Sequence, residues 1–127
     1  MTSTNRGLPD MDDANTQVAF LRSLVADFAR EREWESLHNL KNLAEGISVE
    51  AGELLELFLW KSPEEIERRL DQPEYRLQIE YEIADVLILC LILANHLNID
   101  VSSVISAKLG VDAFKYPANK VRGRPGR

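Results

Sequence analysis

Residues 80–96, "EYEIADVLILCLILANH", are the most apolar stretch of the chain and decide what kind of fold it can adopt. Of the twelve residues from 83 to 94, eleven are apolar and one, Asp85, is an acid. A helix that is apolar on all sides is a buried helix, and this run is too short to span a bilayer. We therefore expect a buried helix that carries an acid into apolar surroundings.

This helix contains a second acid, one turn before the first. At about 100° per residue, Glu82 and Asp85 lie only about 60° apart around the helix axis. The earlier stretch 48–61, "SVEAGELLELFLWK", repeats the arrangement with Glu50 and Glu53 among its leucines. The sequence thus places four carboxylates, two from each of two segments, in apolar surroundings.

Four carboxylates in such a place need a counter-charge. Burying one ionised carboxylate without a partner costs several kcal/mol, and residues 48–60 and 80–96 contain no lysine or arginine. Like charges held close together also raise one another's pKa values. Mg²⁺ favours carboxylate oxygens and keeps water molecules that a phosphate can displace. We therefore expect Mg²⁺ between two facing helices.

Two other interpretations of the acids stay open. The acids can lie on solvated surfaces and pair with lysines elsewhere, which is the better interpretation of a single acidic pair on a leucine-rich helix. A carboxylate-bridged di-iron site is the second, but it needs a Glu-x-x-His motif on its helices. The only histidines, His38 and His96, do not stand at that spacing.

Composition limits the class of protein. The 127 residues suffice for one domain, and 45% of them are hydrophobic, with a net charge of −6. Nucleic-acid-binding proteins usually carry a basic face, which this chain lacks outside its last residues, so we expect no nucleic acid polymer and no membrane as partner. The single cysteine, Cys90, excludes an intrachain disulfide and fits a reducing cytoplasm, and no signal peptide is visible.

The remaining segments also carry helical signals, and none alternates as a strand does. Ser62, Pro63 and Glu65 form a capping box with a proline at the first helical position, and Asp100 is placed to cap a later helix. The helices expected are at about 16–31, 40–60, 63–70, 74–97 and 101–114. We predict an all-α domain at 14–116, with a flexible lead-in at 1–13 and a basic flexible tail at 117–127.

The first acidic pair belongs to a longer motif at 31–60, "EREWESLHNLKNLAEGISVEAGELLELFLW". Glu-x-x-Asp at 82–85 and Lys-Tyr-Pro at 115–117 follow it. This ordered set resembles the MazG-like all-α NTP pyrophosphohydrolases, and most of all their small dCTP-pyrophosphatase branch, over about residues 18–120. The resemblance implies a four-helix-bundle-like MazG fold with an additional short helix.

The resemblance also implies an activity and an assembly. Members hydrolyse nucleoside triphosphates between the α and β phosphates to a monophosphate and pyrophosphate, and this chain would prefer dCTP or related or modified dNTPs, in a role such as nucleotide pool sanitation. Mg²⁺ would be the cofactor, with Mn²⁺ as a substitute. A homotetramer (dimer of dimers) or a homodimer is expected, with a neighbouring subunit building part of the pocket.

Carried over by position, the resemblance assigns roles to individual residues. The metal ligands and catalytic groups would be Glu50, Glu53, Glu82 and Asp85. Glu53, ahead of Glu50, would orient or deprotonate the attacking water. The residues assigned to the base pocket and to the phosphate and sugar side are Trp34, His38, Lys41, Asn42, Trp60, Lys108, Asp112, Lys115 and Tyr116.

Two positions depart from the family pattern and keep alternatives open. Asp112 stands where the family commonly has asparagine, and Leu89 stands where it often has tyrosine. Because an acid at 112 repels a triphosphate unless it joins the metal shell, a non-catalytic helical dimer that binds nucleotide or metal is one alternative. Phosphoribosyl-ATP pyrophosphohydrolase or a dUTPase-like activity is another, although the run at 34–42 favours the dCTP-type branch.

Overall fold

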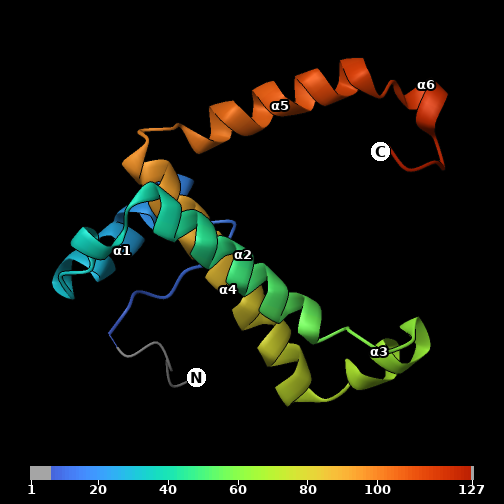
Figure 1. Ribbon diagram of the computed structural model, residues 1–127, viewed down its shortest axis with the longest axis horizontal. Helices are drawn as coiled ribbons and strands as arrows, with labels where there is room; N and C mark the ends of the chain where they lie inside the picture. Colours follow the sequence, from blue (N-terminus) through green and yellow to red (C-terminus); the bar gives the residue numbers. More distant parts are fainter. Residues whose placement is uncertain (1–6, 127) are drawn as a thin grey trace.

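The computed structural model describes residues 7–126, and every regular element within that range is a helix (Figure 1). The elements in chain order are α1 Val18–Glu31, the short 3-10 helix η1 Glu35–Leu37, α2 Leu40–Glu56, α3 Pro63–Arg69, α4 Pro73–His96, α5 Val101–Lys115 and α6 Ala118–Val121. The predicted all-α fold is confirmed. The sequence patterns did not predict η1, or α6, which lies in the segment expected to be a flexible tail.

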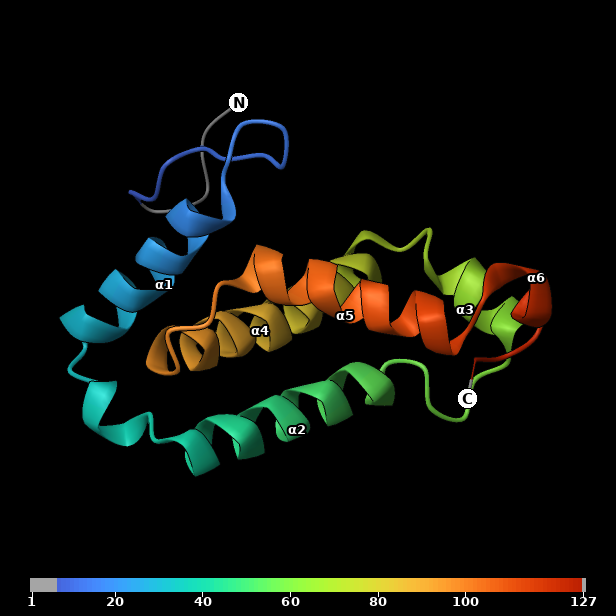
Figure 2. The same cartoon turned by 90° about the horizontal axis from the view of Figure 1, so that it is seen from above.

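Helix α4 is the centre of the fold. Helix α2 runs beside it and α1 crosses one of its ends, whereas α5 extends away from the pair (Figures 1 and 2). The buried side chains gather where these three helices meet: Leu43 of α2 is 1% exposed, and Ala29, Ile92 and Ala94 are also buried. The core is therefore small and lies at one end of the α2–α4 pair.

A buried tyrosine fixes the opposite end of the same pair. The hydroxyl of Tyr75 donates a hydrogen bond of 2.6 Å to the carbonyl of Leu57, just after α2 ends. A buried hydroxyl needs such a partner, so this bond sets the register of the two antiparallel helices. Glu50 lies seven residues before Leu57, and Glu82 lies seven residues after Tyr75. Equal steps of about 10 Å along each helix place these two acids opposite one another.

The helix starts follow the sequence signals. The side chain of Ser62 accepts a hydrogen bond from the Glu65 amide at 3.1 Å, which confirms the predicted cap of α3. Asp100 caps α5 in the same way through the Ser103 amide. Such caps satisfy amides that have no partner within the helix.

Helix α1 ends in a left-handed turn whose central residue is not glycine. Glu33 has φ 55°, its amide donates to the Arg30 carbonyl, and the Trp34 amide donates to the Ala29 carbonyl, each at 3.0 Å. This pattern is a Schellman motif, which usually places glycine at the left-handed position. The turn directs the chain back so that the Trp34 ring lies 5.9 Å from the ring of Phe28.

The helix predicted at 40–60 ends one turn early. The amides of Leu57 and Phe58 donate three residues back rather than four, at 3.2 and 2.9 Å, which tightens the end of α2. Trp60 then adopts a left-handed backbone with φ 62° and its side chain is 94% exposed. The apolar pattern therefore continues past the end of the helix, and it misplaced the boundary by one turn.

The expectation that residues 83–94 are buried on all sides is wrong for the single chain. Ile83, Leu87 and Ile88 are 44%, 57% and 41% exposed, and Leu109 and Phe114 of α5 are 63% and 89% exposed. A chain with this much uncovered apolar surface has room for a protein partner. Among residues 7–126, no helix combines the length and apolar content needed to cross a bilayer.

Replacing Glu33 with glycine should stabilise the fold. A side chain in the left-handed region costs about 1 kcal/mol, and the greater freedom of glycine in the unfolded chain offsets part of that gain. We expect Glu33→Gly to raise the Tm by about 2 °C, measured by circular dichroism at fixed protein concentration. Asn98, with φ 53° at the end of α4, is the control. Asparagine tolerates this backbone conformation, so Asn98→Gly should raise the Tm less than Glu33→Gly does. A lower Tm for Glu33→Gly would contradict the interpretation.

Candidate metal centre and adjoining pocket

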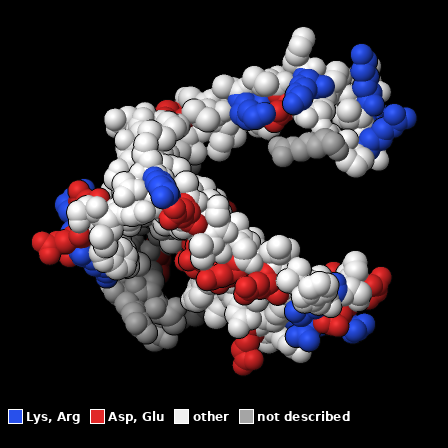
Figure 3. Space-filling view, in the orientation of Figure 1, with Lys and Arg blue, Asp and Glu red and all other residues white. Residues whose placement is uncertain are grey.

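Three acids from two helices meet at the middle of the α2–α4 pair. Glu50 and Glu53 of α2 and Glu82 of α4 each offer a carboxylate oxygen, and these oxygens lie within 4.8 Å of one another. Glu50 and Glu53 are one turn apart on α2, and the register set by Tyr75 brings α4 to them. Figure 3 shows acidic side chains gathered along this pair of helices.

The site contains buried oxygens without protein partners. Oε2 of Glu50 and Oε2 of Glu82 are inaccessible to solvent and accept no hydrogen bond from any residue of the described range 7–126. Within residues 7–126, no lysine or arginine forms an ion pair with any of the three acids. Buried carboxylates are normally paired or bound to metal, and an all-oxygen donor set suits Mg²⁺. The residues present therefore fit a divalent cation held by α2 and α4.

The crowding of the carboxylates changes the acidity of Glu50. Its burial, together with close contacts to the carboxyls of Glu53 and Glu82, raises the pKa of Glu50 to about 7. The negative charges of Glu53 and Asp85 add to this rise. Without a cation, the site therefore retains a proton near neutral pH, and a metal ion has to displace that proton.

Asp85, the fourth predicted ligand, lies beside the cluster and not inside it. Its charge contributes to the raised pKa of Glu50, but its oxygens are not among those within 4.8 Å of one another. The side chain is exposed and lines a pocket next to the acids. Asp85 thus links the acidic cluster to the neighbouring pocket.

This pocket has a volume of about 530 Å³ and lies between α1 and α4. Apolar side chains of the two helices form most of its walls, and Trp34, His38 and Asp85 supply its polar groups. Leu89, which replaces the tyrosine common in the family, is one of the apolar residues. It also packs on Gly46 of α2, where an added Cβ would come within 3.2 Å of it.

The turn between α1 and α2 positions the pocket's two rings. The rings of Trp34 and His38 meet edge to face at 6.4 Å. The Asn42 side chain donates to the Leu37 carbonyl at 3.0 Å, and the Asn39 side chain caps α2, so both hold the turn that carries His38. Nδ1 of His38 is buried and has no hydrogen-bond partner among residues 7–126.

Two residues predicted for the site do not reach this pocket in the single chain. Lys41 forms an exposed ion pair with Glu45 at 3.6 Å, on the surface of α2. Trp60 is almost fully exposed and does not line this pocket.

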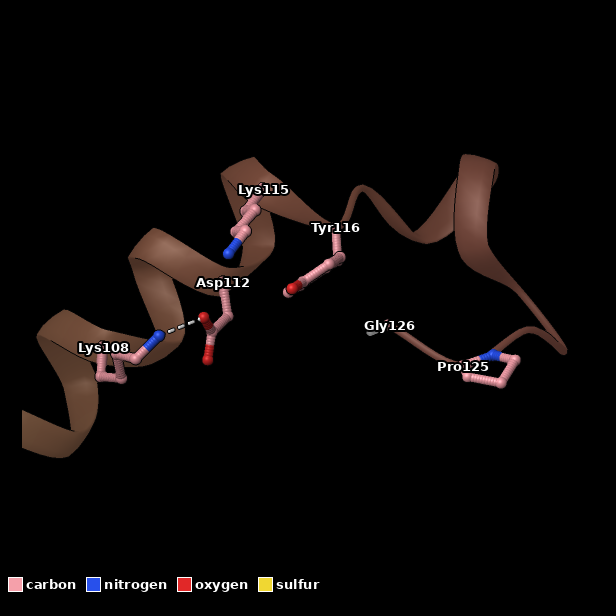
Figure 4. Close-up of a pocket in the computed structure, with 6 residues that line it drawn as sticks. All are labelled: Lys108, Asp112, Lys115, Tyr116, Pro125 and Gly126. Carbon is pink, nitrogen blue, oxygen red and sulfur yellow. Dashed lines mark hydrogen bonds and ion pairs between the residues drawn. The ribbon is translucent and has the colours of Figure 1, made fainter.

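The four residues predicted for the phosphate and sugar side form a second cavity at the far end of α5. Lys108, Asp112, Lys115 and Tyr116 line it together with residues 125 and 126, and its volume is about 700 Å³ (Figure 4). Lys108 pairs with Asp112 across one helical turn. Within one chain this cavity lies well apart from the acids of α2 and α4 (Figures 1 and 3).

The acid and aromatic motifs did not indicate the part of α1 that builds the pocket. Phe28 lines it, and the guanidinium of Arg32 stacks over the outer side of the Phe28 ring at 3.5 Å. A usable signal was present, because Phe28 continues the helical apolar spacing of Leu24 and Val25, which line the same pocket.

The chain is similar in sequence to a known protein family. The MazG-like family matches residues 46–124, which include both acidic pairs and α5. The chain belongs to the MazG-like family. The family resemblance of the sequence motifs is therefore confirmed.

Relatives of this MazG-like chain have described activities. It is 38% identical over 103 residues to dCTP pyrophosphatase 1 of Rattus norvegicus, covering 81% of this chain and 61% of the relative. It is 36% identical over 102 residues to dCTP pyrophosphatase 1 of Homo sapiens, covering 80% and 60%. The chain thus spans about three-fifths of the length of these curated relatives.

A solved structure shares the fold. The crystal structure of a pyrophosphatase from Archaeoglobus fulgidus superposes with a TM-score of 0.73 and 33% sequence identity. The similarity covers 85% of this chain and 99% of that one, so the helices of this MazG-like chain occur together in a solved structure.

The raised pKa of Glu50 predicts how pH affects stability and metal binding. A carboxyl whose pKa is higher in the folded state stabilises the fold when protonated, so the metal-free protein should lose Tm as pH rises through about 7. Mg²⁺ should reverse this loss because it binds only the folded site. Between pH 6 and 8, the Mg²⁺ concentration for a half-maximal Tm shift should fall about tenfold.

Thermal melts in EDTA and in a Mg²⁺ series measure both effects. Glu50→Gln is the matched control, because an amide cannot titrate and should flatten the metal-free pH dependence of the Tm between about pH 4.5 and 7. A Mg²⁺ midpoint that stays constant from pH 6 to 8 would contradict the interpretation.

Proposed function

We propose that this MazG-like protein is a Mg²⁺-dependent nucleoside triphosphate pyrophosphohydrolase, with dCTP or a related or modified dNTP as its preferred substrate. It cleaves between the α and β phosphates and releases a monophosphate and pyrophosphate. The observation that carries the proposal is the convergence of Glu50, Glu53 and Glu82, together with the buried, unpartnered oxygens of Glu50 and Glu82. The names of the mammalian relatives support dCTP, and the single cysteine supports a cytoplasmic location.

The exposure of each acid indicates whether it would bind the cation or the attacking water. Glu50 and Glu82, whose oxygens are buried, would hold the cation, and Asp85 would extend the acidic site toward the pocket. Glu53 is exposed and can contact water, so it is the residue to orient the attacking water and accept its proton. Bound Mg²⁺ would supply positive charge that neutralises phosphate oxygens and lowers the pKa of a water.

The apolar pocket is the place for the base. Its volume lies within the usual range for small-molecule sites, and it adjoins the acids through Asp85. Trp34 offers an aromatic face on which a base can stack, and the free Nδ1 of His38 can form a hydrogen bond with the base edge. This arrangement places the triphosphate toward the acids and the base toward α1.

The uncovered apolar surface supports a homotetramer, as a dimer of dimers, or a homodimer. Helix α5 leaves Val104, Ile105, Leu109 and Phe114 at least half exposed, and it extends away from α2 and α4 (Figure 1). A second copy would cover this helix, as symmetric oligomers commonly do. Lys115 of one copy could then lie beside the phosphates bound by another.

A nucleotide panel tests the activity. The protein is incubated with each of the four canonical dNTPs, dUTP and phosphoribosyl-ATP, with and without Mg²⁺, and the products are separated by ion-exchange chromatography. We expect monophosphate and pyrophosphate in equal amounts, fastest from dCTP and only with Mg²⁺. Release of orthophosphate, or nucleotide binding without turnover, would contradict the proposal, and the second result would favour the non-catalytic binding dimer.

Amide substitutions test the acidic site. Glu53→Gln and Asp85→Asn remove negative charge without changing side-chain size, and each should lower kcat/KM by at least about 100-fold. Their metal-free Tm should stay level or rise, because each change relieves repulsion between carboxylates. Glu56→Gln is the control, since Glu56 is an exposed acid on α2 outside the cluster. Full activity in both test variants would rule out the metal role.

A charge on α5 tests the assembly. Leu109 is 63% exposed in the single chain, so Leu109→Asp should cost little in the monomer and should disrupt an oligomer that buries this helix. Light scattering after size-exclusion chromatography should show a smaller species for Leu109→Asp. Ser106→Asp adds the same charge to the same helix at an exposed polar position and should leave the mass unchanged. A wild-type monomer would refute the assembly.

A further inference from the structure

The segment ahead of α1 contributes to the base pocket. Residues 7–17 contain two large apolar side chains, Leu8 and Met11. Both line the pocket that also contains Trp34, His38 and Asp85. They remain 49% and 42% exposed, so they stand at the rim of the pocket and are not part of the core.

A tight turn brings this segment back to the pocket. The Asn15 amide donates to the Asp12 carbonyl at 3.2 Å and to the Asp12 carboxylate at 2.9 Å. The Asn15 side chain donates to the same carboxylate at 3.0 Å. Asp and Asn side chains stabilise such turns by bonding to nearby backbone. The chain therefore reverses between Met11 and α1, which places Leu8 and Met11 over the pocket formed by α1 and α4.

We propose that residues 8–11 form the outer wall of the base pocket, and that Leu8 and Met11 are specificity-determining residues for the nucleotide base. This inference rests on the proposed function, in which the pocket receives the base. The two side chains offer only apolar contact, so they favour a planar base and exclude water from it. Exclusion of water strengthens the hydrogen bonds that His38 makes to the base, so the wall sharpens the choice among bases.

The geometry separates this role from support of the fold. Half-exposed side chains outside the core add little to stability, so their loss should leave the Tm nearly unchanged. They also lie on the base side of the site and are not among the metal-binding acids. Their loss should therefore weaken nucleotide binding without changing metal binding or the chemical step.

The test compares Leu8→Ser and Met11→Ser with Leu40→Ser in the full chain. Leu40 is 49% exposed, like Leu8, and lines none of the described pockets. For each protein, kcat and KM are measured with each of the four dNTPs. The Kd for dCMP is measured by calorimetry, and the Tm is measured with and without Mg²⁺. In both wall variants we expect KM for the best substrate and the Kd for dCMP to rise about tenfold. Their kcat and their Tm shift with Mg²⁺ should remain at the wild-type level. The ratio of kcat/KM between the best dNTP and the other dNTPs should fall, because the variants discriminate less among the bases.

Conservative substitution separates contact from sequence identity. Met11→Leu keeps the apolar contact and should retain the wild-type KM. If instead any substitution at Met11 disturbed the nearby turn, Met11→Leu would raise KM as Met11→Ser does. If the enzyme is active and both serine variants keep wild-type KM and base preference, the wall is refuted and the proposed activity stands.

The binding measurement keeps the two proposals distinguishable. If the protein binds dCMP but hydrolyses no dNTP, the proposed activity fails, and weaker dCMP binding in the serine variants still supports the wall. If the wild-type protein neither binds dCMP nor hydrolyses a dNTP, both proposals are refuted.

Discussion

Repulsion among carboxylates held at close range is the constraint on which the rest of this structure depends. Glu82 would move away from Glu50 and Glu53 if α4 could slide or rotate against α2, since every ångström of separation lowers the unfavourable energy. The structure opposes this at both ends of the α2–α4 pair. Tyr75 bonds to the end of α2, and Leu43 is enclosed at the opposite end. A small core thus suffices to hold carboxylates that repel one another, and a bound cation would convert the cluster from a destabilising feature into a stabilising one.

The same constraint explains why charge is distributed as it is. Cations paired with the acids would neutralise them and weaken their affinity for metal. Figure 3 shows basic residues along α5 and in the segment after it, and others around α1 and α3, and no lysine or arginine among the described residues forms an ion pair with Glu50, Glu53 or Glu82. Helix α5 also exposes the apolar residues that a second copy would cover. Assembly would therefore bring the cations of α5 toward phosphates bound by another copy, whereas within one chain they stay apart from the acids. A chain with both groups in one pocket would pair them internally through ordinary salt bridges.

The sequence predicted the features whose cause is local or periodic. The helices, the cap at Ser62 and the pairing of acids on two helix faces all follow from spacing of a few residues. The missed features depend on tertiary context. Nothing at Glu33 signals the left-handed turn that positions Trp34, because glycine or asparagine would normally stand there. The polar lead-in gave no reason to expect Leu8 and Met11 in a pocket, since two apolar residues have no period. Whether Asp85 joins the metal shell depends on fractions of a helical turn that sequence spacing does not resolve.

The departures at Asp112 and Leu89 would have different effects. Asp112 changes the charge of the cavity at the end of α5, and Leu89 changes the polarity of the pocket between α1 and α4. Asp112 is paired with Lys108, so its charge does not face the nucleotide unopposed, but this pair also removes Lys108 as a free cation. Lys115, which lies against the Tyr116 ring and forms no ion pair among the described residues, then carries the positive charge of that cavity. Binding of the triphosphate would depend more on metal than on lysine. On the base side, Leu89 replaces a polar ring with apolar surface, and with Leu8 and Met11 it makes the pocket drier. Under the proposed function, the chain would therefore select the base by apolar contact around a single histidine, and would bind the phosphates through the acids and a cation held by them.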